Sequence, residues 1–167
     1  DVTEPRTQEF ITSAVRSRKY AVVGNAVPCG TASRARERPI PEHLKKLGVP
    51  EPKPLRTDEF PLGKPGLVGM NKIRVEAANQ VYAFAIQLAF LCIQLGIFFW
   101  IENPFGSLFW CIPFVLQLLA HKSVIRVVFH ACMHGGSRNK LVLMIVSCPA
   151  LMQLEAGCDN SHKHEPW

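Results

Sequence analysis

Two apolar stretches, each ending in a short polar string, constrain the fold of this chain more than any other feature. Tyr20 to Val27 and Ile97 to Ile101 are rich in β-branched and aromatic residues, which predicts buried strands. Between them, Asn71 to Gly96 begins polar, becomes apolar and stops at a glycine, as helices often do. We therefore expect a parallel strand pair whose carboxyl ends meet at one sheet edge, where ligands bind in open α/β sheets.

The rest of the chain continues the alternation of helices and strands, which predicts a parallel α/β sheet with helices on both faces. We expect a single domain over residues 1–167. The further predicted elements are a helix over 8–18, a helix over 107–120, strands over 124–133 and 141–146, and a helical turn over 151–155. Residues 39–69 are rich in proline and lack periodicity, so they are predicted to form a long loop.

The stretch from Val81 to Ile101 also allows a membrane protein, because it is long and apolar enough to cross a bilayer. However, Gly96 is followed by an aromatic, β-branched run and then by Glu102, an awkward terminus in lipid. This order favours a helix followed by a strand, and a membrane is therefore not favoured as a partner. A membrane protein fragment stays as the last alternative for the function of this chain.

The net charge of +6 lies entirely in residues 1–75, since the remaining residues carry equal numbers of acidic and basic side chains. Such a skew suits a polyanion such as DNA, although a solvated basic face explains it equally well. Several of the six cysteines lie inside apolar segments and nothing signals secretion, so we expect reduced thiols and an intracellular protein.

The two polar strings carry a candidate nucleophile and a candidate acid. Cys29 follows Pro28 at a strand end, where backbone N–H groups of the next loop can stabilise a thiolate. Glu102 follows five apolar residues, so a half-buried carboxyl group could donate a proton. The plainer interpretations are a structural cysteine in a turn and a helix cap made by Asn103 or Ser107.

A third string, His134 to Lys140, follows the strand predicted over 124–133. Its two glycines let backbone approach a ligand closely, and Arg138 and Lys140 can meet phosphate or a base carbonyl. By itself this is a common glycine turn with exposed cations.

Taken in order, the three strings resemble those of DNA cytosine-5 methyltransferases. That family carries Pro-Cys after one strand, Glu-Asn-Val after the next, and a glycine turn leading to Gln-x-Arg-x-Arg after a third. The counterparts here are Pro28-Cys29, Glu102-Asn103-Pro104, and His134-Gly135 leading to Arg138 and Lys140. Over residues 20–167, the longer strings PCGTASRARE and IENPFGSLFW look like a methyltransferase-like domain of large protist and retroelement-type proteins.

The resemblance implies a mechanism in which Cys29 adds to a flipped cytosine, Glu102 acts as the acid and Arg138 meets the base carbonyl. It further implies methyl transfer from S-adenosylmethionine, DNA as partner and a nuclear location. The residues expected to contact the substrate are Pro28, Asn103, Arg34, Arg36 and Lys140.

The family's Gly-rich cofactor loop comes several strand–helix units before the catalytic strand, whereas only 27 residues precede Pro28. We therefore expect a partial Rossmann-like methyltransferase sheet that lacks the cofactor-binding half. Because the chain also opens at Asp1, it is expected to be a fragment whose upstream segment is a partner. The alternative is a catalytically inactive module of the same fold that binds nucleic acid or has a structural role.

The tail over residues 158–167 and the strand before it contain a possible zinc site. Zinc in proteins is usually held by four cysteine or histidine side chains in a tetrahedron. The five candidate ligands are Cys132, His134, Cys158, His162 and His164. Their spacing matches no common zinc finger, and a solvated histidine cluster is the alternative.

Overall fold

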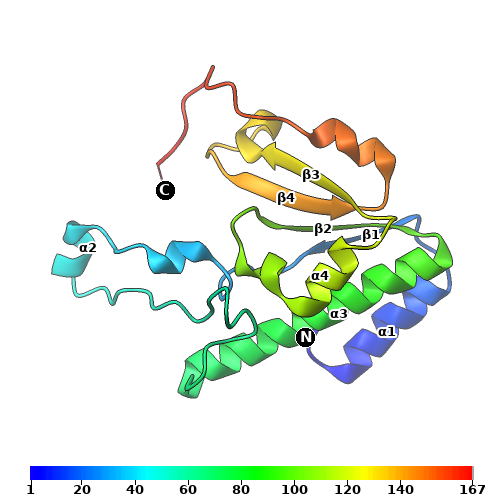
Figure 1. Ribbon diagram of the computed structural model, residues 1–167, viewed down its shortest axis with the longest axis horizontal. Coiled ribbons are helices and arrows are strands. Elements are labelled where there is room, and N and C mark those ends of the chain that lie inside the picture. The colour runs from blue at the N-terminus through cyan, green and yellow to red at the C-terminus, as the bar shows by residue number, and fades with distance from the viewer. Residues whose placement is uncertain (167) are drawn as a thin grey trace.

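The computed structural model describes residues 1–166, so only Trp167 of the predicted Cys/His tail lies outside the described residues. Its centre is a sheet of four strands in the order β1-β2-β4-β3 (Figure 1). The strands are β1 (Val22–Ala26), β2 (Phe98–Pro104), β3 (Ile125–His130) and β4 (Leu141–Val146). The α-helices are α1 (Pro5–Arg16), α2 (Glu42–Lys46), α3 (Gly69–Leu95) and α4 (Pro113–Leu119). Short 3-10 helices are η1 (Arg34–Glu37), η2 (Leu108–Cys111), η3 (Ala131–His134) and η4 (Pro149–Leu154).

The sheet is mixed, so the prediction of a parallel sheet is wrong. β1 and β2 are parallel as expected, but β4 runs antiparallel to both β2 and β3. The physical reason is the short connection between β3 and β4, which contains only η3 and a turn. A parallel pair needs a crossover of about a dozen residues or more, usually a helix, and α3 provides one between β1 and β2, whereas no such helix separates β3 from β4.

The apolar core lies between the sheet and three helices. Alternate residues of β2 point into it, and Phe99, Ile101 and Asn103 are completely buried. Figure 1 shows α1, α3 and α4 gathered on one side of the sheet, rather than helices on both faces as expected. Side chains of these helices form one cluster with the inward-facing residues of β2 and β4.

Helix α3 is the crossover that fixes the parallel pair. It ends at Gly96, which adopts the left-handed conformation (φ 69°) that glycine accepts without strain, and β2 follows, as predicted. It is also the single described helix long and apolar enough to cross a membrane by length and composition. In the structure α3 contacts β1, β2, α1 and α4, so it occupies the place of a core helix.

Several element bounds differ from the predicted ones for local reasons. The predicted helix over 107–120 is split, because Pro113 has no N–H to continue η2 and instead begins α4. The Pro-rich segment over 39–69 contains the short helix α2 but is otherwise irregular, as expected. β2 extends to Pro104, so Glu102 and Asn103 lie inside the strand rather than after it.

Candidate functional site

The carboxyl ends of β1 and β2 bring the two predicted polar strings to one edge of the sheet. Ala26 lies opposite Glu102 in the parallel register, and the loop that carries Cys29 begins directly after β1. β4 begins at this same edge because it is antiparallel to β2, and Lys140 is the residue before it. The observed register therefore places a thiol, a carboxylate and a cation on neighbouring segments.

Hydrogen bonds hold the Cys29 loop on both sides of the cysteine. Before it, the Nδ2 of Asn103 donates to the carbonyl oxygen of Val27 (2.8 Å), and the hydroxyl of Tyr82 donates to that of Pro28. After it, the backbone N–H of Leu108 donates to the carbonyl oxygen of Ala32 (2.9 Å). Asn103 is fully buried in this role, so in this structure its side chain supports the loop.

Arg56 is a further support of this loop and was missed by the sequence analysis. Its side chain is fully buried, and its guanidinium donates to the hydroxyl of Thr31, to the Oδ1 of Asn79 and to the carbonyl oxygens of Pro61 and Val75. It also lies over the ring of Tyr82, with 5.3 Å from Cζ to the ring centre. Burial lowers the pKa of Arg56 from its usual value. No sequence signal distinguishes it from the exposed arginines nearby.

Cys29 lines a pocket of about 490 Å³ whose charged lining is cationic. The side chains of Arg34, Arg38 and Lys140 provide the positive charge, and Ser33, Ser107 and Asn139 provide further polar groups. The Nζ of Lys140 lies 3.1 Å from the Oε1 of Glu102, which places this cation at the pocket wall. Cys29, Arg34 and Lys140 thus line one pocket, and Glu102 contacts its wall through Lys140.

Arg34 is itself held by two carboxylates. Its guanidinium contacts Glu37 (3.2 Å) and donates a short hydrogen bond to Asp58. This hydrogen bond lowers the pKa of Asp58 and raises the pKa of Arg34, so the pair stays ionised near neutral pH. The two acids reduce the positive charge that Arg34 adds to the pocket, and Glu102 does the same for Lys140.

Two predicted contact residues lie elsewhere. The Nε of Arg36 donates to the carbonyl oxygen of Lys53 (3.0 Å), and Arg36 lines a separate cavity on the other side of the Cys29 loop. The Nε of Arg138 lies 3.8 Å from the carboxylate of Glu165, and Arg138 is not among the described residues that line the Cys29 pocket. The carbonyl oxygen of Pro28 accepts the hydrogen bond from the hydroxyl of Tyr82 that holds the Cys29 loop.

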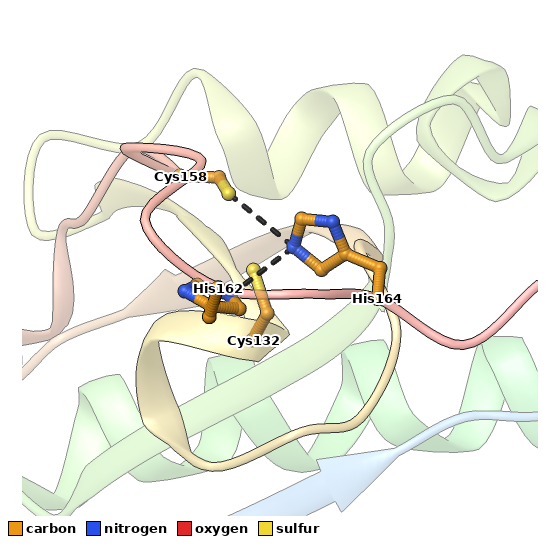
Figure 2. Close-up of side chains that lie close together, drawn as sticks. All are labelled: Cys132, Cys158, His162 and His164. Carbon is orange, nitrogen blue, oxygen red and sulfur yellow. Dashed lines mark hydrogen bonds between the residues drawn. The ribbon is translucent and has the colours of Figure 1, made fainter.

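A second cluster at this edge consists of Cys132, Cys158, His162 and His164, here called the Cys/His cluster. One possible ligand atom from each residue lies within 4.8 Å of the other three. Figure 2 shows the four side chains pointing toward one another, with His164 joined to both Cys158 and His162. Cys132 comes from η3, and the other three come from the tail. Such a cluster could hold a metal ion.

Groups around the Cys/His cluster orient its side chains. The backbone N–H of Asn160 donates to the Sγ of Cys158 (3.4 Å), and the backbone N–H of Cys158 donates to the Nδ1 of His130 (2.9 Å). The Nδ1 of His162 lies 3.8 Å from Asp159. Burial and the neighbouring thiol of Cys158 raise the pKa of Cys132, so its thiol keeps its proton at neutral pH when no metal is bound.

His134 is the fifth predicted ligand, and the structure places it outside the Cys/His cluster. Its Nε2 lies 2.8 Å from the carbonyl oxygen of Leu154, and its ring meets the edge of Phe129 at 5.1 Å. His134 therefore holds η3 against the last residue of η4. Four of the five predicted ligands come together, and the fifth has a structural contact instead.

The described residues do not fit S-adenosylmethionine, the cofactor that the resemblance implied. The segment before β1 is α1, which packs on α3, and the described residues offer no strand followed by a Gly-rich loop. Such a loop is what lets backbone N–H groups approach a nucleotide-like ligand. We therefore derive no step that uses this cofactor.

Comparison of the chain with protein-family models, with curated proteins and with solved structures gave no match. The function is therefore inferred from the Cys29 pocket and the Cys/His cluster.

Proposed function

We propose that the Cys29 pocket binds a pyrimidine base of a nucleic acid and that Cys29 adds to its ring. The observation that carries this proposal is that one thiol and three cations line the same pocket. A volume of about 490 Å³ is within the range of small-molecule sites. The cations suit the phosphates on either side of an extruded base.

The neighbouring side chains have separate roles in this proposal. Lys140, held by Glu102, donates a hydrogen bond to the base where negative charge collects during addition. Arg38 and Arg34 contact the nucleic-acid backbone. Glu102 thus positions Lys140, whereas the sequence alone suggested that the carboxyl group itself was the proton donor.

The proposed reaction can be followed without any cofactor. The Cys29 thiolate forms a bond to C6 of cytosine, and the C5–C6 double bond opens. C5 then takes a proton from water and loses its original hydrogen as a proton. When the S–C6 bond breaks, the double bond and the thiolate return, so the net result is hydrogen exchange at C5. In a longer parent protein that supplies a cofactor site, the same adduct is the one a DNA cytosine-5 methyltransferase requires.

We expect the protein to release tritium into water from an oligonucleotide whose cytosine carries tritium at C5. The Cys29→Ser variant should release no more than buffer does, because a hydroxyl group is a far weaker nucleophile than a thiolate. Cys148→Ser is the matched control, since Cys148 is half-buried, follows the end of β4 that is remote from the pocket, and should not affect the rate. Equal release by wild type and Cys29→Ser would overturn the proposal. DNA binding without release would favour the inactive binding module.

We also propose that the Cys/His cluster binds Zn²⁺. Tetrahedral zinc separates a sulfur and a nitrogen ligand by about 3.6 Å and two nitrogen ligands by about 3.3 Å. The Sγ of Cys158 lies 3.4 Å from the Nε2 of His164, which lies 3.1 Å from the Nε2 of His162. The cluster therefore already has edges close to those of a zinc tetrahedron.

The chemistry of the ligands also favours zinc. Two thiolates and two imidazoles in a tetrahedron suit Zn²⁺ better than cations that prefer oxygen ligands. A proton on the Nδ1 of His162 can face Asp159, which leaves the lone pair of Nε2 directed at the metal. The backbone N–H of Asn160 donates to the Sγ of Cys158, and this contact stabilises a thiolate.

We expect purified protein to contain about one zinc ion per chain, as measured by elemental analysis after dialysis. His164→Gln should lose this ion, because the cluster then has three ligands. His134→Gln is the matched control and should retain it, since His134 bonds Leu154 instead. Retention of zinc by His164→Gln, or its loss from His134→Gln alone, would show that the ligand set is wrong.

A further inference from the structure

The Cys/His cluster and the Cys29 pocket are connected by one short stretch of chain, residues 132–140. Its first residue, Cys132, belongs to the cluster, and its last two, Asn139 and Lys140, line the pocket. A change in how this stretch is held at the cluster can therefore reach the wall of the pocket within a few residues.

The tail contacts the middle of this stretch through a pair of hydrogen bonds. The backbone N–H of Glu165 donates to the carbonyl oxygen of Ser137 (2.8 Å), and the hydroxyl of Ser137 donates to the carboxylate of Glu165 (2.8 Å). Glu165 follows directly after His164, a member of the Cys/His cluster. We call the reciprocal contact between Ser137 and Glu165 the tail clamp.

From these contacts we infer that metal at the Cys/His cluster holds the tail clamp in place and thereby fixes the Lys140 wall of the Cys29 pocket. This inference depends on the zinc site proposed above. The metal joins Cys132 to His164, and the tail clamp joins Glu165 to Ser137, so the two links close a small ring around the glycine turn. Exposed terminal segments are poorly ordered unless contacts hold them against the rest of the protein. Here the bound metal provides such a contact.

The position of Lys140 in the pocket wall depends on the glycine turn that contains Gly135 and Gly136. The N–H of Lys140 donates to the carbonyl oxygen of Arg138 (2.9 Å), and the carbonyl oxygen of Lys140 accepts from the N–H of Ala131 (2.8 Å). Opening of the turn breaks both bonds and releases Lys140 from its position beside Glu102. Metal binding would then control whether the cation faces the pocket.

Hydrogen–deuterium exchange tests this inference on three forms of the full chain. These are the zinc-loaded protein, the same protein stripped by a chelator, and a zinc-loaded double variant, Ser137→Ala with Glu165→Pro, which lacks the backbone N–H as well as both side-chain groups of the tail clamp. Both changed residues lie outside the proposed metal ligands, so the variant should keep its zinc, which elemental analysis verifies. We expect amides 136–141 to exchange at least about tenfold faster in the second and third forms than in the first. Exchange in β2 should be unchanged, which excludes global unfolding.

The possible failures are distinguishable. If the wild-type protein binds no zinc, the proposed metal site is wrong. If zinc binds but its removal leaves exchange at 136–141 unchanged, the metal does not fix the wall. If removal accelerates exchange and the double variant does not, the connection runs through Cys132 alone and the tail clamp has no part in it.

Discussion

Replacing Arg56 with methionine should lower the free energy of unfolding by about 3 kcal/mol. Without the guanidinium, the Oδ1 of Asn79 and the carbonyl oxygen of Pro61 lose donors at 2.7 Å in a part-buried site, and the carbonyl oxygen of Val75 loses a donor in a buried one. Each buried polar group left unsatisfied costs about 1–3 kcal/mol. Removal of a buried cation offsets part of this loss, because the desolvation penalty of the charge disappears. Urea unfolding monitored by tryptophan fluorescence measures the difference.

Arg38→Met is the matched control for this experiment. Arg38 is exposed, so its substitution should change the free energy of unfolding by no more than about 0.5 kcal/mol. Arg56→Lys should recover little, because an ammonium group cannot reproduce the planar array of donors. A loss in Arg56→Met no larger than that in Arg38→Met would mean that the buried hydrogen bonds of Arg56 add nothing to stability.

Arg56 also illustrates where prediction from the sequence stops. The strands and α3 follow from local periodicity and from glycine at a helix end, both of which are visible in a single sequence. Arg56, by contrast, lies in an irregular Pro-rich segment, and its partners Thr31 and Asn79 are more than 20 residues away on either side. Nothing local signals that this arginine is buried.

The sequence predicts the part of the Cys29 pocket that depends on the direction of β1 and β2. The carboxyl ends of a parallel pair meet at one edge, so the meeting of Cys29 and Glu102 segments could be predicted. Lys140 rather than Arg138 reaches Glu102 because it directly precedes β4 and shares the sheet face of Met144, the partner of Glu102. That register depends on the antiparallel direction of β4, which alternation of helices and strands does not reveal.

The Cys/His cluster was only partly predictable for a similar reason. Its tail ligands are close in sequence, but Cys132 joins them only because the tail returns beside β3, where Phe129 pairs with Ala156. The same return places His134 against Leu154 and so removes it from the cluster. Sequence spacing alone could not separate these two neighbours in η3.

Gly24→Val should destabilise the protein by about 2 kcal/mol, although valine favours strands far more than glycine does. Gly24 is an exposed position of β1 opposite Trp100 of β2, and the indole lies where a Cβ atom at Gly24 would point. A Cβ atom at Gly24 would lie 2.2 Å from the Cε2 and Cζ2 atoms of that ring, so the indole would have to leave its position. Overpacking of this kind costs about 1–3 kcal/mol, whereas the gain in strand propensity is at most about 1 kcal/mol.

Overpacking predicts that Gly24→Val is less stable than wild type, whereas strand propensity predicts that it is more stable. The sign of the change in the free energy of unfolding therefore decides between them. Gly30→Ala serves as the control, because no atom lies within 4 Å of a Cβ atom at Gly30 and its stability should stay the same or rise slightly. A red shift of tryptophan fluorescence in Gly24→Val would accompany the loss, since a displaced indole enters water. If Gly24→Val were instead more stable than wild type, the indole of Trp100 could not lie against β1, and the close packing of β1 on β2 that carries the Cys29 loop would have to be revised.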